Sequence, residues 1–152
     1  MSKKYRYQRQ NIKILIWDTA GQEKYKGLIP SYVRNSSIVF IVYDISNRAS
    51  FENVQKWISF VRSIEKGMIV LCGNKVDLKR EVEKKEVQEL AKKEDIEFFE
   101  CSAKYDFNIK KMFYNSIAEL PIFNGSNRKT LVKELIKENE EIYDENEQAK
   151  FI

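Results

Sequence analysis

Four short apolar runs alternate along the chain with segments of helical periodicity. The runs are residues 11–17 (NIKILIW), 37–43 (SIVFIVY), 68–73 (MIVLCG) and 97–101 (EFFEC). Apolar runs of this length, rich in β-branched or aromatic residues and closed by Asp, Asn or Ser, are typical of buried strands in a parallel sheet. The pattern therefore predicts four such strands.

Three helices are predicted between and after these strands. Residues 51–65 repeat apolar side chains at helical spacing, with Ser50 as the expected N-cap and Gly67 as the stop. A second helix, rich in Lys and Glu, covers residues 82–91, and a third covers residues 109–120 before Pro121. Strands that alternate with helices form βαβ units with right-handed crossovers, so the predicted fold class is α/β.

Composition narrows the class of protein. With 152 residues, of which 43% are hydrophobic, the chain is expected to bury one core. No apolar run approaches the roughly 18 residues that a membrane span needs. With no histidine and two cysteines, a zinc site or a disulfide framework is not expected. Cys72 and Cys101 are interpreted as small core residues, and the chain is expected in the cytoplasm.

Charge is uneven at the two ends of the chain. The net charge is +4, yet residues 1–13 hold five bases and no acid. Such a segment suits nucleic acid or an anionic membrane, but Tyr5 and Tyr7 alternate with the bases, which favours the solvated face of a strand. No nucleic-acid partner is expected. Residues 124–152 form a charged tail after a domain at 1–123, with a possible helical stripe that is solvated or, alternatively, a docking surface.

Three polar segments each follow a predicted strand directly: DTAGQE at 18–23, NKVD at 74–77 and CSAK at 101–104. In open parallel sheets, ligands bind beyond the carboxyl ends of the strands. Each segment alone could be a cap, a turn or a polar loop. Their joint appearance in this order, spaced by βα units, favours one ligand site.

Together these motifs resemble the small GTPases of the Ras superfamily, over about residues 2–121. The resemblance implies a P-loop NTPase-like parallel sheet with flanking helices, and GTP or GDP with Mg²⁺ as cofactors. It implies six residues at the guanine base: Asn74, Lys75, Asp77, Ser102, Ala103 and Lys104.

Each of these residues has an implied role. Asp77 would accept two hydrogen bonds from N–H groups of guanine, a pattern that adenine cannot offer. Asn74 would tie the neighbouring loops together and help to read the base, and Lys75 would lay its alkyl stem along the purine and ribose. The N–H of Ala103 would meet the guanine carbonyl, held by its neighbours in the chain.

The first motif carries the phosphate chemistry in this resemblance. Asp18 would orient Mg²⁺ through water. The N–H of Gly21 would approach the γ-phosphate, where the absence of a Cβ permits close contact. Gln22 would be the catalytic residue that orients the attacking water.

The resemblance narrows to the Rab family through WDTAGQE (17–23), and to its Golgi-associated branch through LIPSYVR (28–34), YDISN (43–47), SFEN (50–53) and KWI (56–58). It implies a role in vesicle trafficking with Rab effectors and regulators as partners. Trp17 and Tyr32 match aromatic positions of the Rab effector surface; ordinary packing beside the sheet is the alternative.

The phosphate-binding sequence G-x-x-x-x-G-K-[ST] occurs nowhere in the 152 residues, because none of the five glycines precedes a lysine. The match begins at the family's second strand, so the first strand, P-loop, first helix and switch I threonine are missing. Losing about six charge-assisted hydrogen bonds at roughly 1.5 kcal/mol each would weaken affinity about a million-fold. We therefore expect an amino-terminally truncated chain that neither binds GTP tightly nor hydrolyses it alone.

No cysteine follows Cys101, so the prenyl anchor usual in Rabs is not encoded, and stable membrane attachment is not expected of this form. A full-length lipidated form would act at the Golgi or another endomembrane surface. Two other hypotheses remain: a nucleotide-free pseudo-GTPase that serves as an interaction module, and a weak guanine sensor that uses Asp77, Lys75 and Ala103.

Overall fold

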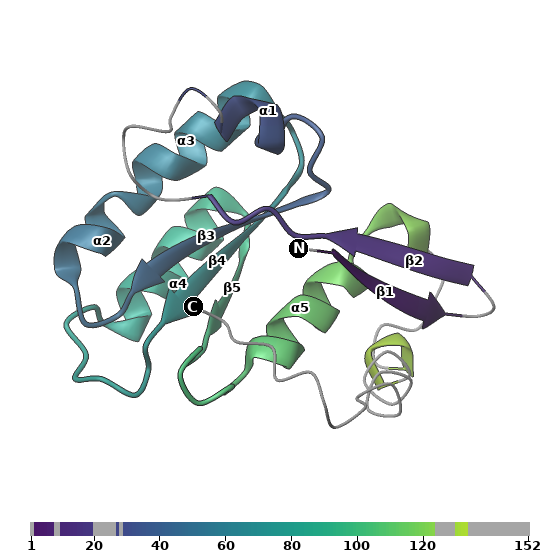
Figure 1. Ribbon diagram of the computed structural model, residues 1–152. Helices are drawn as coiled ribbons and strands as arrows, with labels where there is room; N and C mark the ends of the chain where they lie inside the picture. The colour runs from purple at the N-terminus through teal and green to yellow at the C-terminus, as the bar shows by residue number, and fades with distance from the viewer. Residues whose placement is uncertain (1, 8–9, 20–26, 28, 124–129, 134–152) are drawn as a thin grey trace. The chain divides into compact units, whose positions relative to one another are not determined.

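The computed structural model describes residues 2–7, 10–19, 27, 29–123 and 130–133. The chain forms two compact units, which are described separately (Figure 1). The sheet unit comprises residues 21–112, and the hairpin unit comprises residues 1–20 together with 113–152.

A three-stranded parallel sheet organises the sheet unit. It contains β3 (Ile38–Asp44), β4 (Met68–Asn74) and β5 (Glu97–Glu100) in the order β3-β4-β5. These strands confirm three of the four predicted from apolar runs, and their order places β4 in the centre. The carboxyl ends of β4 and β5 therefore lie next to each other.

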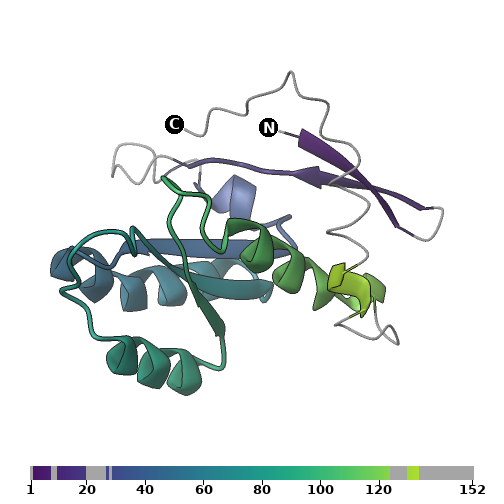
Figure 2. The ribbon, with the colours of Figure 1, turned by 90° about the horizontal axis from the view of Figure 1, so that it is seen from below.

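Helices flank the sheet, and α3 and α4 cover the same face of it (Figure 2). No helix among the described residues is long and apolar enough to cross a membrane. Helix α5 begins in the sheet unit and ends in the hairpin unit. The helical elements are α1 (Ile29–Val33), α2 (Arg48–Glu52), α3 (Val54–Ile64), α4 (Lys84–Glu94), α5 (Ile109–Ala118) and the short 3₁₀ helix η2 (Pro121–Phe123).

The helix predicted over residues 51–65 is two helices, α2 and α3, and the prediction of Ser50 as its N-cap is wrong. Asn47 caps α2 and accepts a hydrogen bond from the Ser50 N–H at 3.2 Å. The Ser50 hydroxyl instead exchanges hydrogen bonds with the main chain of Asp44, both at 3.0 Å. Helix periodicity revealed the buried face but not this bond back to the strand. Helix α1 was not predicted either.

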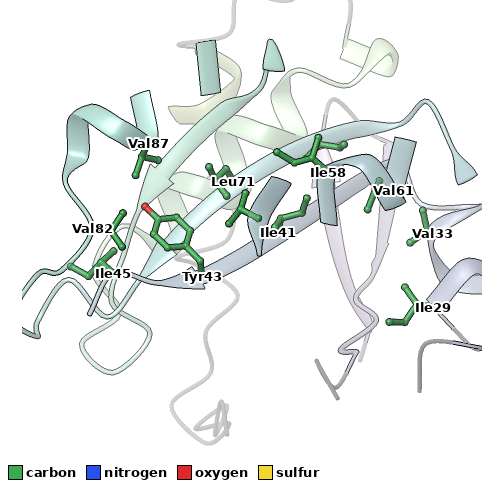
Figure 3. Packing of buried hydrophobic residues seen from close by; sticks show 12 residues of the cluster. Ile29, Val33, Ile41, Tyr43, Ile45, Ile58, Val61, Leu71, Val82 and Val87 are labelled. Atoms are coloured by element: carbon green, nitrogen blue, oxygen red, sulfur yellow. The ribbon is translucent and has the colours of Figure 1, made fainter. Parts of the chain in front are cut away.

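One hydrophobic cluster joins the sheet to its helices (Figure 3). Ile41 and Tyr43 of β3 and Leu71 of β4 pack with Ile58 of α3 and Val87 of α4. Because β4 is the central strand, its residues 69–73 are all buried. Strand β3 is an edge strand, and its Val42 is 59% exposed, so the expectation of a strand buried on both faces is wrong for β3.

The hairpin unit contains an antiparallel pair, β1 (Ser2–Tyr7) and β2 (Gln10–Leu15), with Ser2 opposite Leu15. The predicted strand at 11–17 thus ends at Leu15, and it joins an antiparallel pair rather than the parallel sheet. Among the described residues, β2 pairs with β1 and β3 with β4, so no strand joins the two sheets.

The carboxyl-terminal part of the hairpin unit is helical where it is described. The predicted helix at 109–120 is confirmed as α5, which ends at Ala118. Residues 130–133 of the tail are helical, and Leu131 is buried, as are Ile117 and Phe123. The remainder of the predicted tail at 124–152 lies outside the described residues.

Candidate functional site

The loops after β4 and β5 are joined by backbone hydrogen bonds that continue the parallel ladder beyond the strands. The Cys101 N–H donates to the Gly73 carbonyl at 2.9 Å, and the Val76 N–H donates to the Cys101 carbonyl at 3.2 Å. Neighbouring parallel strands end at the same edge of a sheet, so their following loops lie side by side. The structure thereby brings the second and third sequence motifs together.

Asn74 is the centre of this arrangement. Its Oδ1 accepts hydrogen bonds from the Lys75 N–H at 2.8 Å and from the Ala103 N–H at 3.0 Å. The resemblance implies that Asn74 ties the two loops together, and these bonds form such a tie. The Ala103 N–H, implied to meet the guanine carbonyl, thus already has a partner, so a base would have to share it as a three-centre bond.

Asp77 is held by the third motif. Ser102, which is only 1% exposed, donates its hydroxyl proton to Asp77 Oδ1 and accepts the Tyr105 N–H at 3.3 Å. Asp77 itself is exposed. A carboxylate has about four lone-pair sites, so one bond from Ser102 fixes its orientation and leaves acceptor capacity for a ligand.

Lys75 has a left-handed backbone with φ of 66°, uncommon for a residue with a Cβ. Its N–H is bonded to Asn74, and its ammonium lies 2.7 Å from Asp44 Oδ2. The resemblance implies that the stem of Lys75 lies along the purine, and the ion pair with Asp44 fixes the position of that stem.

Asp44 is a site residue that sequence reasoning missed, because YDISN served only as a family marker. The available signal was its position: Asp44 ends β3, as Asn74 ends β4. Its Oδ1 accepts from Ser46 through the N–H at 2.8 Å and the hydroxyl at 2.7 Å. Partial burial alone would raise the pKa of Asp44, but the bonds from Lys75 and Ser46 outweigh it and hold the pKa below its ordinary value.

The turn after Ser102 is short and closed on itself. Ser102 and Phe107 exchange two backbone hydrogen bonds at 3.1 and 3.0 Å, and Asn108 donates its amide to the Glu100 carbonyl at 2.9 Å. Lys104, implied to help hold the base contact, has its ammonium 5.1 Å from the centre of the Tyr105 ring. The turn therefore presents an exposed lysine and aromatic side chains beside the Asn74–Asp77 loop.

Two thiols lie under these loops. Cys72 and Cys101 are buried, as predicted for core residues, and their sulfur atoms are 3.2 Å apart. The hydrogen bond that the Cys72 thiol shares with Cys101, together with burial, raises the pKa of Cys72. The two side chains thus pack against each other between β4 and the residue that follows β5.

The first motif is described only in part. Trp17 is 58% exposed and Asp18 is also exposed, while the predicted Gly21 and Gln22 lie outside the described residues. Asp18 and Trp17 belong to the hairpin unit, whereas Tyr32, half-buried in α1, belongs to the sheet unit. The structure thus brings together the residues of the second and third motifs within the sheet unit.

Mg²⁺ has a poor set of candidate ligands in the part of the chain that is described. No group of three or more His, Cys, Asp or Glu residues gathers there. One exposed carboxylate, that of Asp18, does not by itself match the octahedral oxygen set that Mg²⁺ prefers. The described residues therefore do not by themselves supply a magnesium site.

A comparison with protein-family models shows the family of the chain. The model described as "Ras family" matches residues 1–121. The chain therefore belongs to the Ras family of small GTPases. Proteins of this family bind guanine nucleotides with Mg²⁺ and engage effectors and regulators, which supports a GTP-binding regulatory role.

Proposed function

We propose that this chain is a Rab-like small GTPase of the Golgi-associated branch, which regulates vesicle trafficking and reads guanine with the loops after β4 and β5. The observation that carries the proposal is the pair of bonds that tie those loops: Ala103 N–H to Asn74, and the Ser102 hydroxyl to Asp77. They build a fixed hydrogen-bonding edge at the carboxyl end of a parallel sheet, where such sheets bind ligands.

The chemistry of this edge suits guanine better than adenine. Guanine offers two adjacent N–H donors, at N1 and at the exocyclic amine, and a carboxylate such as that of Asp77 accepts both. Adenine offers an unprotonated N1, which would face the carboxylate without a proton between them. Leaving such polar groups unpaired costs about 1–3 kcal/mol, so the edge favours guanine by roughly tenfold or more.

The phosphate half of the proposal is weaker for these 152 residues, since G-x-x-x-x-G-K-[ST] is not among them. Without a lysine and backbone N–H groups around the phosphates, most of the affinity should come from the base and ribose. In the complete site of a small GTPase, Gln22 would orient the attacking water and Asp18 would face Mg²⁺ through water.

The test of guanine recognition is a nuclear magnetic resonance titration of the chain with guanosine, GTP and adenosine. We expect saturable shifts of the Asn74, Lys75 and Ala103 amides with guanosine, at most about tenfold tighter binding of GTP, and no saturation with adenosine. Saturation by both purine nucleosides with equal affinity would contradict the proposal.

A matched variant sharpens this test. Asp77→Asn presents one acceptor and one donor in place of two acceptors, which complements xanthine, with its N1–H and neighbouring carbonyl. We expect the variant to prefer xanthosine over guanosine. Asp106→Asn, an exposed aspartate in the turn after Ser102, is the control and should retain the preference for guanosine.

The Rab part of the proposal rests on the motifs WDTAGQE, LIPSYVR and YDISN and on the exposure of Trp17. A fluorescent fusion should co-localise with Golgi membranes when effectors bind, and Trp17→Ala should reduce that signal. Tyr105→Ala, which removes a similarly exposed aromatic at 64% exposure, is the control. Partner binding by a chain that ignores guanosine would instead identify a nucleotide-free interaction module.

A further inference from the structure

Asp44 stands at the end of β3, outside the two motifs that read the base, yet it contacts one of them directly. Its Oδ2 is 2.7 Å from the Lys75 ammonium. The Asp44 side chain is 18% exposed and that of Lys75 is 52% exposed, so the carboxylate is the sheltered partner. The ion pair thus links the end of β3 to the loop after β4.

Asp44 is itself held in place before any ligand arrives. Ser46 donates two hydrogen bonds to its Oδ1, and the Ser50 hydroxyl exchanges hydrogen bonds with its main chain. The following residue, Ile45, donates its N–H to the Asn74 carbonyl at 3.0 Å, which binds the end of β3 to the loop that carries Lys75. The carboxylate is therefore a fixed point, while lysine has a long side chain with several free torsions.

We propose that Asp44 is a positioning residue of the guanine site, an inference that rests on the proposed function. Asp44 holds the Lys75 side chain extended, so that its stem can contact the base and ribose. The backbone of Lys75 is already fixed by its left-handed φ and by the bond to Asn74. The ion pair fixes the other end of the side chain. Ordering a free lysine side chain costs binding energy, so anchoring it in advance strengthens binding of the nucleoside.

The same ion pair defines the chemical class of the ligand. With its charge compensated by Asp44, Lys75 offers the ligand an apolar stem rather than an unpaired cation. The part of the ligand that it contacts should therefore be the neutral purine nucleoside, not a phosphate group.

The experiment compares guanosine affinity among variants of the full 152-residue chain by nuclear magnetic resonance titration. We expect Asp44→Asn to weaken guanosine binding about fivefold and Asp44→Glu to restore part of the loss. In a Lys75→Met background, Asp44→Asn should cause no further loss, because its partner is gone. Glu52→Gln, which removes a carboxylate paired with Arg48 elsewhere in the sheet unit, should leave affinity unchanged.

The outcomes separate this proposal from the guanine site itself. Unchanged guanosine affinity in Asp44→Asn, or an equal loss in the Lys75→Met background, overturns the positioning role while the guanine site stands. Added salt should reduce the difference between wild type and Asp44→Asn, which a purely structural loss would not show.

A chain that binds no guanosine would refute the guanine site. A second measurement, which needs no nucleotide, therefore tests the ion pair itself. Lys75 is the charged group that faces the Asp44 carboxyl, and the other donor to that carboxyl, Ser46, is neutral. Titration of the Asp44 carboxyl should therefore give a midpoint that rises in Lys75→Met. An equal midpoint in both proteins shows that the ion pair does not hold Lys75 in solution and overturns the proposal.

Discussion

The loops after β4 and β5 and the segment after β2 follow strands in the same manner, but the structure supports them differently. Strand β4 has parallel neighbours on both sides, so its loop receives hydrogen bonds from both: Ala103 N–H to Asn74, and Ile45 N–H to the Asn74 carbonyl. Among the described residues, β2 pairs in its sheet with β1 alone; Leu15 at its end is exposed, as are Trp17 and Asp18 beyond it.

The difference shows that neighbouring strands, and not the motif alone, bring the residues of a motif together. Two parallel strands that end at one edge place their loops within hydrogen-bonding distance, whereas a hairpin turns its partner strand away in the opposite direction. The second and third motifs therefore form one hydrogen-bonded edge within the sheet unit.

The largest effect is expected from Asn74→Ala. The substitution removes the acceptor of two backbone N–H groups, those of Lys75 and Ala103, and should lower the free energy of unfolding by about 2–3 kcal/mol. Urea denaturation followed by circular dichroism measures it. Asp18→Ala should cost less than about 0.5 kcal/mol, and equal losses for both variants would remove the contrast.

Gly73→Ala should be the next largest, because a Cβ at residue 73 would lie 2.6 Å from Tyr43 Oη and 2.9 Å from its Cζ. That hydroxyl is buried without a partner among the described residues, and it cannot move without disturbing the core. We expect a loss of about 2 kcal/mol in unfolding free energy.

The controls for Gly73→Ala are a second glycine and a double variant. Gly27→Ala should be nearly neutral, since a Cβ there meets nothing within 4 Å. Combining Gly73→Ala with Tyr43→Phe should recover part of the loss, because the closest atom is then absent. A stability of Gly73→Ala equal to that of Gly27→Ala would contradict the close approach of β4 to Tyr43.

Ser102→Ala should affect both stability and ligand binding, each moderately. It removes the donor to Asp77 and the acceptor of the Tyr105 N–H, at an expected cost of about 1–1.5 kcal/mol in unfolding free energy. Because Asp77 then loses its fixed orientation, guanosine affinity should fall by up to about tenfold. Ser102→Thr keeps the hydroxyl and should retain guanosine binding if its added methyl is accommodated.

The smallest effect is the pH dependence that Asp44 contributes. Its pKa in the folded chain is below the ordinary value of 3.8, so its stabilisation is present above about pH 4 and is lost as pH falls through the lower folded pKa. We expect about 0.5 kcal/mol from this group. Asp44→Asn should flatten the stability profile below pH 4 by that amount, as measured by thermal unfolding across pH; an unchanged profile would contradict it.

Much of the fold could be predicted because its signals are local. The runs SIVFIVY, MIVLCG and EFFEC became β3, β4 and β5, since apolar β-branched runs bury well in a sheet. The pairing of β2 could not be predicted from NIKILIW, because the pattern within one strand does not identify the strand that lies beside it. Exposure of Val42 likewise depends on the position of β3 at the edge, which periodicity does not encode.

The candidate site likewise contains some residues that could be predicted from the sequence and others that could not. Asn74, Asp77 and Ser102 were identified from motifs whose residue types and order carry the chemistry, and the structure brings them together. Asp44 was missed because its partner, Lys75, is distant in sequence and adjacent in space. Ser50 was assigned to a helix cap because its bond to Asp44 also depends on the fold.

The class of fold, the family and the candidate residues at the ends of β4 and β5 could be inferred from the sequence alone, because these depend on residue types and spacing along the chain. Only the tertiary structure decided which strand-end motifs share an edge, that Asp44 anchors Lys75, and that the Ser102 hydroxyl orients Asp77. These features depend on strand order and register, which arise from packing between distant segments: hydrogen bonds across neighbouring strands form only after β3, β4 and β5 have assembled.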